Sequence, residues 1–214
     1  MELGKDLIFA RNVEGLTALM QNAVVGIAGC GGLGSNIAVA LTRAGIGKLI
    51  LLDFDIIEPS NLNRQYFFLN DVGKLKVDAL SKHLKNINSE IIIEKQIKQI
   101  DKEDTEKIFY PADILIEAFD RAESKKFLIE SWVKAFPDKP VIVGNGLSGF
   151  GNTDLLKVQK VGNIYFCGDG FTNMDLGLTS ARVAIVANMQ ANLAIEIIAK
   201  KGGLNADYKQ PRQD

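Results

Sequence analysis

The stretch VVGIAGCGGLGSN, residues 24–36, decides the fold of this chain. Its first half is an apolar run rich in valine and isoleucine, which predicts a buried strand, and apolar residues at helical spacing follow. Between them Gly29, Gly31 and Gly34 form the pattern G-x-G-x-x-G, with Gly32 as an additional glycine. Glycines allow a tight turn and close approach of a ligand, and the helix that follows offers free N–H groups to an anion. We therefore expect a nucleotide phosphate here, rather than a tight turn without a ligand.

The next apolar run, KLILLDFD at 48–55, ends in acidic residues. Asp53 lies nineteen residues after Gly34, where nucleotide-binding folds hold a ribose hydroxyl. The glycines and this acid predict a nucleotide site without identifying the nucleotide. A nicotinamide-dependent dehydrogenase remains an alternative at this point.

Strand and helix patterns alternate on both sides of the glycine stretch. Uniformly apolar strands separated by amphipathic helices predict an α/β, Rossmann-like, mainly parallel sheet with helices on both faces. The expected strands lie at 23–29, 48–55, 90–97, 112–120 and 139–146, and the expected helices at 34–45, 71–87, 102–110 and 122–136.

The pattern changes after Gly151. Residues 155–169 read as two strands around a turn at Gly162 and Asn163, which predicts an antiparallel C-terminal extension of the sheet. A long, alanine-rich helix is expected at 178–200, buried in the core or at a subunit contact. No repeat or linker interrupts the chain, so we expect residues 1–214 to form one domain.

Composition excludes several classes of function. The 25 basic and 26 acidic residues nearly cancel, which argues against a nucleic-acid partner. No apolar run reaches the roughly 18 residues of a membrane span, and the first residues lack the order of a signal peptide. The two cysteines lie far apart, so neither a disulfide framework nor a zinc site is expected. These features favour a cytoplasmic protein.

Polar residues follow Asp53 in the segment DFDIIEPSNLNRQYFF, which a dehydrogenase does not require. Asn61, Arg64 and Gln65 lie just past the carboxyl end of a strand, where open α/β sheets bind ligands, and an arginine can fork onto phosphate oxygens. A helix beginning at Asp71 would direct Lys76 with the apolar face, so this lysine either extends its amine to solvent or meets an anion. Beside a phosphate loop we favour the phosphate contact.

Asp120 ends the apolar strand in ILIEAFDRAE at the same edge of the sheet. An acid beside a triphosphate commonly carries Mg²⁺. The alternative is an N-cap for the helix that starts near Arg121, and one residue can serve both roles.

In order and spacing, GCGGLGSN, DFDIIEPSNLNRQ, DVGKLKVDAL and EAFD resemble the E1-like activating enzymes of the ThiF/MoeB/HesA group. The likeness covers roughly residues 8–200 and is greatest to the shorter ThiF branch without zinc cysteines, adenylyltransferases that act on sulfur carriers in thiamine biosynthesis. The resemblance implies ATP and Mg²⁺ as cofactors, no zinc, and a homodimer. It implies a nucleotide site made of Gly29, Gly31, Gly32, Gly34, Asp53, Asp55, Asn61, Arg64, Gln65 and Lys76, with Asp120 on the metal and Arg11 offered across the dimer to the γ-phosphate.

The implied reaction is adenylation of a small ubiquitin-like, ThiS-like carrier protein that ends in Gly-Gly. The carrier's terminal carboxylate attacks the α-phosphorus of ATP, and pyrophosphate leaves. Arg64, Lys76, Arg11 and the metal on Asp120 would stabilise the leaving group. The carboxylate is already ionised near neutral pH, so no general base is required, and His83 is expected to pack or to lie at the surface.

Two later segments carry open alternatives. The glycine-rich residues 143–154 line a channel for a diglycine tail or form a mobile loop, and residues 168–175 would cross that channel as a lid. Cys167 in an apolar run forms a covalent link with the carrier or, as we favour, is an inert buried thiol.

Other functions fit parts of the pattern. Within the superfamily these are a molybdopterin-carrier activator, a peptide-activating enzyme and a tRNA-adenosine dehydratase. From other classes come a nicotinamide-dependent oxidoreductase, which gives Arg64 and Lys76 no role, and a non-catalytic nucleotide sensor.

Overall fold

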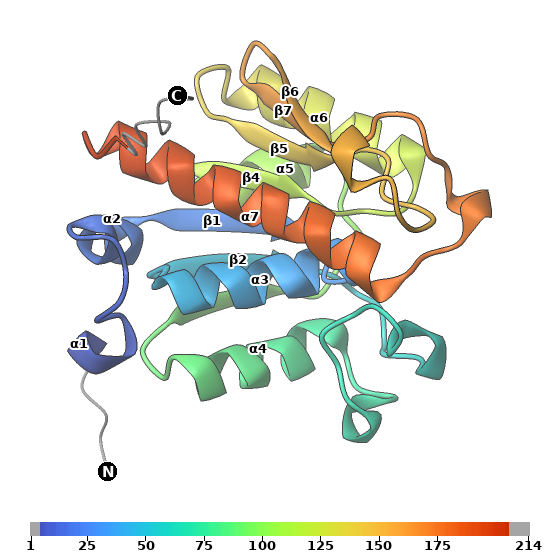
Figure 1. Cartoon of the computed structure of the whole chain (residues 1–214), viewed down its shortest axis with the longest axis horizontal. Coiled ribbons are helices and arrows are strands. Elements are labelled where there is room, and N and C mark those ends of the chain that lie inside the picture. Colours follow the sequence, from blue (N-terminus) through green and yellow to red (C-terminus); the bar gives the residue numbers. More distant parts are fainter. Residues whose placement is uncertain (1–4, 206–214) are drawn as a thin grey trace, which may run out of the picture.

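A computed structural model describes residues 5–205 of the chain, and a single twisted sheet of seven strands forms its centre (Figure 1). The strand order is β3-β2-β1-β4-β5-β7-β6, and all neighbours pair in parallel except β6 and β7. The strands are β1 (Val24–Ala28), β2 (Lys48–Leu52), β3 (Ile92–Gln96), β4 (Ile114–Glu117), β5 (Val141–Gly144), β6 (Lys157–Val161) and β7 (Ile164–Gly168). The predicted Rossmann-like α/β fold and its antiparallel extension are confirmed.

Strand β1 lies in the middle of the sheet, where Val25 is opposite Leu49 of β2 and Ile114 of β4. The central strands are almost wholly buried, because helices cover both of their faces. This burial explains why their sequences read as continuous apolar runs rather than as alternating ones.

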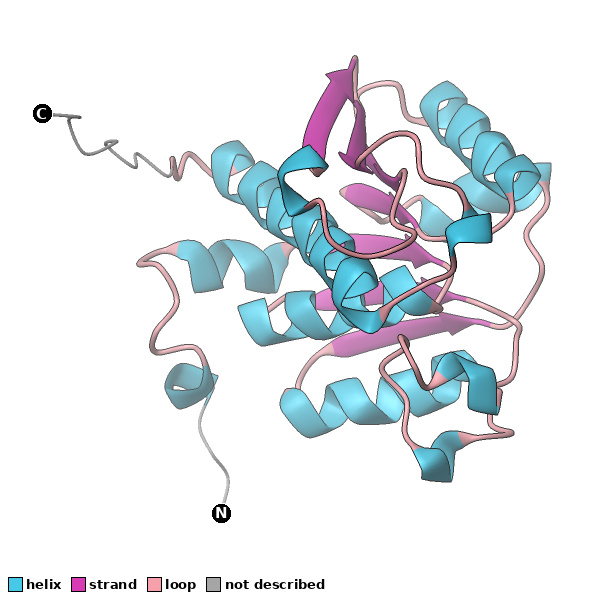
Figure 2. Cartoon of the chain, turned by 45° about the vertical axis from the view of Figure 1, so that its right-hand side comes forward, coloured by secondary structure: helices cyan, strands magenta, loops and turns pink. Residues whose placement is uncertain are grey.

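Helices form a layer on each side of the sheet (Figure 2). One face carries α3 (Gly32–Ala44), α4 (Lys76–Ile87) and α7 (Ser180–Lys201), and the other carries α5 (Lys102–Phe109) and α6 (Ala122–Ala135). The short helices α1 (Lys5–Ile8) and α2 (Leu16–Asn22) precede β1 at its amino end. Four 3-10 turns complete the described secondary structure, at Pro59–Asn61, Leu69–Asp71, Thr153–Leu155 and Met174–Leu176.

The long helix predicted at 178–200 is α7, and it packs lengthwise on α3. Its inward residues recur at helical spacing, including Val183, Val186, Ala187, Ala191 and Ala194. Within residues 5–205 this is the one helix whose length and apolar character would suffice for a membrane span. Its buried stripe instead belongs to the core of the sheet domain.

The helix expected to begin at Asp71 begins five residues later, at Lys76. Residues 69–71 form a 3-10 turn, and Gly73 then takes a left-handed conformation with φ of 85°. The Lys76 N–H bonds to the Asp55 carbonyl at 3.0 Å, and the chain enters the helix from there. The expected helix start at Asp71 is therefore wrong, although Lys76 lies on the buried face of the helix as expected.

Candidate functional site

A cleft of about 650 Å³ opens at the carboxyl ends of the parallel strands. The glycine loop, the segment after β2, the turn after β4 and the loops after β5 and β7 all contribute to its wall. Six cationic side chains line it against three acidic ones, which favours an anionic ligand. The cations are Arg64, Lys76, Lys98, Arg121, Lys125 and Lys126, and the acids are Asp53, Asp55 and Asp120.

The glycines of the loop have two roles: some are needed for the backbone turn, and others face the cleft. Gly29 has φ of 98°, and a Cβ on Gly34 would lie 1.8 Å from the Gly29 carbonyl oxygen, so these two positions are needed for the turn itself. Gly31 and Gly32 face the cleft at the start of α3. The first N–H groups of a helix lack intrahelical partners, which suits an anion placed there.

Asp53 ties the glycine loop to the end of β2. Its Oδ2 accepts the Cys30 N–H at 2.7 Å, and its Oδ1 accepts the Asp55 N–H at 2.8 Å. Burial raises the pKa of this carboxyl, partly offset by Lys76 and by these two N–H groups. Each oxygen keeps a further lone pair for a donor in the cleft.

Lys76 is the buried cation of the site. Its side chain is only 9% exposed, and its Nζ lies 2.7 Å from Asp55 Oδ2. Asp55 itself is half exposed, so it holds the lysine from the solvent side of the cleft. The lysine amine thus points into the cleft rather than out to solvent, and a phosphate would find it already oriented.

Arg64 and Gln65 lie beside the glycine loop, near Gly32 and Gly31, and line the cleft. The Arg64 guanidinium donates to the Ser60 carbonyl at 3.1 Å and to Asn63 Oδ1 at 2.7 Å. The buried Gln65 amide lies near Gly31, and its Oε1 has no partner among the described residues. The cleft therefore offers a solvent-accessible guanidinium and an incompletely bonded amide beside the loop.

Three predicted residues do not line the cleft. Gly34 serves the turn, and the buried Asn61 accepts the Glu58 N–H at 3.1 Å and so caps the 3-10 turn before Arg64. Arg11 is exposed in the segment between α1 and α2. The neighbouring Asn12 donates to the carbonyl of Ala44 at the far end of α3, which puts Arg11 at the opposite edge of the sheet from this cleft.

Asp120 lies exposed at the cleft, two residues before α6. The residue at the N-cap position is Arg121, and no side chain caps this helix. The alternative role of Asp120 as the cap is therefore wrong, and its carboxylate is left for the cleft.

The model of the ThiF family matches residues 5–212. The chain belongs to the ThiF family. This confirms the likeness to E1-like activating enzymes read from the glycine loop and the NLNRQ segment. Among curated relatives, the adenylyltransferase and sulfurtransferase MOCS3 of Anopheles gambiae is 30% identical over 203 residues, which cover 91% of this chain and 45% of the mosquito protein. The tRNA threonylcarbamoyladenosine dehydratase of Bacillus subtilis is 36% identical over 149 residues, covering 68% of this chain and 56% of that protein.

Solved structures share the fold of this ThiF-family chain. The E. coli tRNA threonylcarbamoyladenosine dehydratase TcdA superposes with a TM-score of 0.84 at 18% identity, covering 92% of this chain and 96% of TcdA. E. coli MccB, solved with ATP, gives a TM-score of 0.70 at 26% identity, covering 86% of this chain and 58% of MccB. The chain thus spans about half the length of the mosquito relative and nearly all of TcdA.

The sequence analysis of this ThiF-family chain did not predict a buried ion pair beneath the cleft. Glu117, wholly buried at the end of β4, lies 2.7 Å from Lys125 Nζ, and Lys125 also donates to the Gly144 carbonyl at 3.1 Å. Glu117 Oε1 accepts the Phe119 N–H at 2.7 Å and so shapes the turn that carries Asp120. Burial raises the pKa of Glu117, and Lys125 offsets part of that rise. Glu117 and Lys125 are eight residues apart, one in a strand and the other in a helix, so no local sequence pattern predicts that they pair.

A second buried pair, Asp169 and Arg182, was also missed. Asp169 belongs to the loop at 168–175, and Arg182 belongs to α7. That loop is also bonded to the loop at 143–154: the Asp169 N–H bonds to the Gly146 carbonyl at 3.0 Å, and the Gly170 N–H bonds to the Asn145 carbonyl at 3.0 Å. The first loop lines the cleft through residues 144–148 and the second through Thr172 and Asn173. Both predicted segments therefore reach the cleft as one bonded wall.

The remaining candidates lie in the interior. Cys30 and Cys167 are both fully buried, and burial raises the pKa of the Cys167 thiol to about 12. His83 lies 2.6 Å from Asp71 Oδ2 and packs edge-on against Phe68. None of these three residues lines the cleft, in agreement with the inert thiol favoured for Cys167 and the packing or surface position expected of His83.

Proposed function

We propose that this chain is an ATP-dependent adenylyltransferase that activates the C-terminal glycine carboxylate of a ubiquitin-like sulfur carrier of the ThiS type and releases pyrophosphate. One observation carries the proposal. Lys76 and Arg64, from separate segments, line the same cleft as the glycine loop and Asp53. A dinucleotide dehydrogenase has no need of this second cationic segment, whereas a triphosphate does.

Each residue then has a role set by its position. Asp53 takes the ribose, while the α3 N-terminus, with Gly31 and Gly32, takes a phosphate. Lys76 and Arg64 neutralise the triphosphate and stabilise the charge that grows on pyrophosphate as it leaves. Asp55 keeps the Lys76 amine in the cleft. Catalysis is mostly positioning and electrostatics, because the attacking carboxylate is ionised already.

Asp120 fits a magnesium ion held jointly with phosphate oxygens, because Mg²⁺ is usually bound by one or two carboxylates plus substrate phosphates. When bound, the ion would neutralise charge on the triphosphate. No cluster of three or more metal-binding side chains occurs among the residues that the structure describes, so Asp120 would act with the substrate rather than in a protein cage.

In the proposed function, Arg11 acts in the cleft of a second subunit. Its own cleft lies at the other end of α3, a helix of 13 residues that spans roughly 20 Å. A side chain at this edge reaches a triphosphate only in another copy of the chain. A homodimer with shared sites is therefore part of the proposed function.

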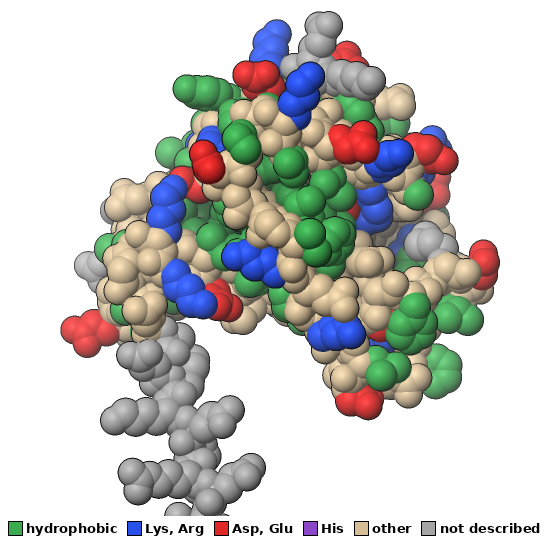
Figure 3. All heavy atoms as spheres, turned by 90° about the horizontal axis from the view of Figure 1, so that it is seen from above, with side chains coloured by type: hydrophobic (Ala, Val, Ile, Leu, Met, Phe, Trp, Pro, Cys, Tyr) green, Lys and Arg blue, Asp and Glu red, His purple; other side chains and the backbone are tan. Residues whose placement is uncertain are grey.

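The choice of acceptor rests on the ThiF family and on relatives named as sulfurtransferases or as a ubiquitin-like modifier-activating enzyme. A role in forming the thiazole of thiamine follows from the ThiS-type acceptor. A tRNA substrate is the second candidate, favoured by the B. subtilis dehydratase and the TcdA fold. The formal charge of −1 and the interspersed charges on the face in Figure 3 give little support to a tRNA-binding surface.

ATP–pyrophosphate exchange tests the proposal. Separate reactions would contain a ThiS-type carrier ending in Gly-Gly, a molybdopterin-type carrier, tRNA bearing threonylcarbamoyladenosine, or no acceptor. Exchange that depends on the ThiS-type carrier is expected, and a carrier without its last glycine is the control. Exchange with another acceptor alone would reassign the substrate. Tight NADH binding without any exchange would overturn the reaction class.

A further inference from the structure

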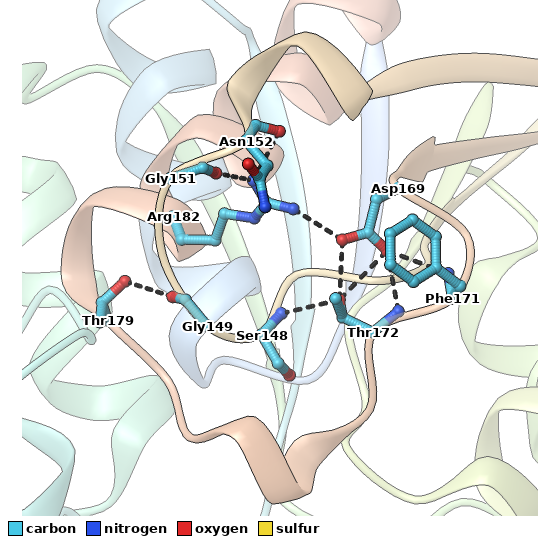
Figure 4. A network of polar contacts seen from close by, with 9 residues as sticks. All are labelled: Ser148, Gly149, Gly151, Asn152, Asp169, Phe171, Thr172, Thr179 and Arg182. Carbon is cyan, nitrogen blue, oxygen red and sulfur yellow. Dashed lines mark hydrogen bonds and ion pairs between the residues drawn. The ribbon is translucent and has the colours of Figure 1, made fainter.

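One guanidinium joins three segments behind the cleft (Figure 4). Arg182, near the start of α7, places Nη2 2.6 Å from Asp169 Oδ2, and both side chains are almost fully buried. Arg182 Nη1 donates to the carbonyl of Gly151 and, at 3.2 Å, to that of Asn152. The loop after β5, the loop after β7 and α7 therefore meet at this side chain.

Asp169 relays the contact to the surface of the cleft. Its Oδ1 accepts the N–H groups of Phe171 and Thr172, each at 2.9 Å, and its Oδ2 accepts the Thr172 hydroxyl at 2.9 Å. Thr172 Oγ1 in turn accepts the Ser148 N–H at 3.3 Å. Thr172 and Ser148 both line the cleft, so an unbroken chain of contacts runs from α7 to its wall.

The backbone here takes conformations that need such support. A Cβ on Gly146 would lie 2.0 Å from Asp169 Oδ1, so the carboxylate packs directly on the loop backbone. Asn152 is the one non-glycine residue with positive φ in the described part of the chain, and Arg182 holds its carbonyl. Strained backbone of this kind persists only where surrounding contacts hold it, and it gathers at functional sites.

The two sides of the cleft carry different chemistry. The glycine loop, Asp53 and Lys76 belong to the β1 and β2 side, where the nucleotide is proposed to bind. The opposite side is made by residues 145–152 and 171–173, which we call the acceptor wall. Its cleft-lining members are small or uncharged, and they leave room for a polypeptide backbone rather than for phosphate.

We propose that Asp169 and Arg182 are positioning residues that hold the acceptor wall in the shape that admits the acceptor's C-terminus. This inference rests on the proposed function for the identity of the acceptor. Removing one partner from a buried pair strands the other charge, so the wall's shape depends on both. The nucleotide side shares none of the contacts of this pair and should bind ATP unchanged.

Arg182→Lys keeps the charge but cannot bridge Asp169 and the two carbonyls together. We expect the KM for a ThiS-type carrier in ATP–pyrophosphate exchange to rise about tenfold or more, because small misplacements of a binding group are costly. The Kd for ATP, by calorimetry, should stay within about twofold, because the groups proposed to bind ATP do not contact this pair and are not misplaced. Thr172→Val leaves the ion pair intact but cuts its link to Ser148, and a smaller rise in KM is expected.

Hydrogen exchange of the chain without acceptor gives a second readout. Amides at 145–152 and 171–173 should exchange faster in both variants. Lys139→Met is the matched control, because Lys139 Nζ also donates to two backbone carbonyls, of Tyr110 and Ala112, but at the opposite edge of the sheet. Lys139→Met should change neither the KM for the carrier nor the rate of amide hydrogen exchange in the acceptor wall.

The outcomes separate the two proposals. If the wild-type chain shows no ATP–pyrophosphate exchange with any acceptor, the proposed function fails. Amide hydrogen exchange then still decides whether Asp169 and Arg182 hold the acceptor wall. Should Arg182→Lys fail to fold, Thr172→Val decides. The positioning role would be overturned if amide hydrogen exchange and the KM for the carrier were both unchanged. It would also be overturned if the Kd for ATP rose as much as the KM.

Discussion

Lys76 Nζ lies 2.7 Å from Asp55 Oδ2, and the same two residues share a backbone hydrogen bond from the Lys76 N–H to the Asp55 carbonyl at 3.0 Å. The double contact starts α4 at Lys76 and turns its side chain into the cleft. An anion that enters the cleft therefore meets a lysine whose amine is already in place, with Asp55 as its resting partner. The proposed activity depends on this amine.

Lys76→Met should lower ATP–pyrophosphate exchange about 100-fold or more, because the lost cation faces charge that grows in the transition state. Methionine keeps most of the side chain's volume, so the fold should remain. Lys74→Met is the control: Lys74 lies two residues away, half exposed and paired with Asp71, outside the cleft. Equal losses in both variants would remove Lys76 from the proposed mechanism.

Two glycines of the loop should respond differently to alanine. Gly34→Ala would place a methyl 1.8 Å from the Gly29 carbonyl, and we expect a loss of about 3 kcal/mol or more in the free energy of unfolding. In Gly31→Ala the nearest atom is 3.7 Å away, so the loss should stay below about 1 kcal/mol. Its methyl faces the cleft, and the Kd for ATP should rise about tenfold. Urea unfolding and calorimetry measure both, and unimpaired ATP binding by Gly31→Ala would contradict the phosphate site.

The Asp169 and Arg182 pair predicts a pH dependence of stability. Burial alone would raise the pKa of Asp169, but the N–H groups of Thr172 and Phe171, the Thr172 hydroxyl and Arg182 together hold that pKa below its ordinary 3.8. The stabilisation is therefore complete above the ordinary pKa and is lost as the pH falls through the folded-state value. Asp169→Asn should be less stable by about 3–5 kcal/mol near neutral pH.

Urea unfolding of both proteins across pH measures this difference. It should stay constant down to about pH 5 and shrink below about pH 4. A difference that shrinks as the pH rises above neutral would mean that another group carries the effect.

Arg11 gives a prediction about shared sites. Arg11→Ala and Lys76→Ala should each be nearly inactive, and an equimolar mixture should recover roughly a quarter of wild-type exchange, because half of the dimers are mixed and each has one intact site. A mixture of Lys76→Ala with Arg64→Ala is the control, since both residues line the cleft of their own chain. No recovery in the first mixture would place Arg11 outside the mechanism.

Cys167 should play no covalent part. Burial raises the pKa of its thiol to about 12, so almost no thiolate exists near neutral pH. Cys167→Ala should keep carrier-dependent exchange, at a cost of about 1 kcal/mol in stability. Iodoacetamide should leave the native chain unmodified by mass spectrometry and should label both cysteines in urea. A carrier adduct that disappears in Cys167→Ala would contradict this.

Local patterns were enough for most of the fold. Apolar runs of strand length, helical periodicity and glycines between them are properties of neighbouring residues, so β1, α3 and the antiparallel pair of β6 and β7 were predicted near their true bounds. The start of α4 was not, because a contact with Asp55, distant in sequence, overrides the helical pattern of residues 71–75. Boundaries that depend on a tertiary partner carry no local signal.

The site divides in the same way. The sequence alone determined the glycine loop, the acid after β2 and the cationic segment that follows, because each is a motif of neighbouring residues whose types indicate their chemistry. The segments at 143–154 and 168–175 were also predicted to lie near the ligand, but only the tertiary structure decided which side chains hold them together and which ion pair lies beneath the cleft. Asp169 pairs with Arg182, and Glu117 pairs with Lys125, between different elements of the fold. Both pairs are fixed because they are buried, and burial depends on residues that are distant in the sequence.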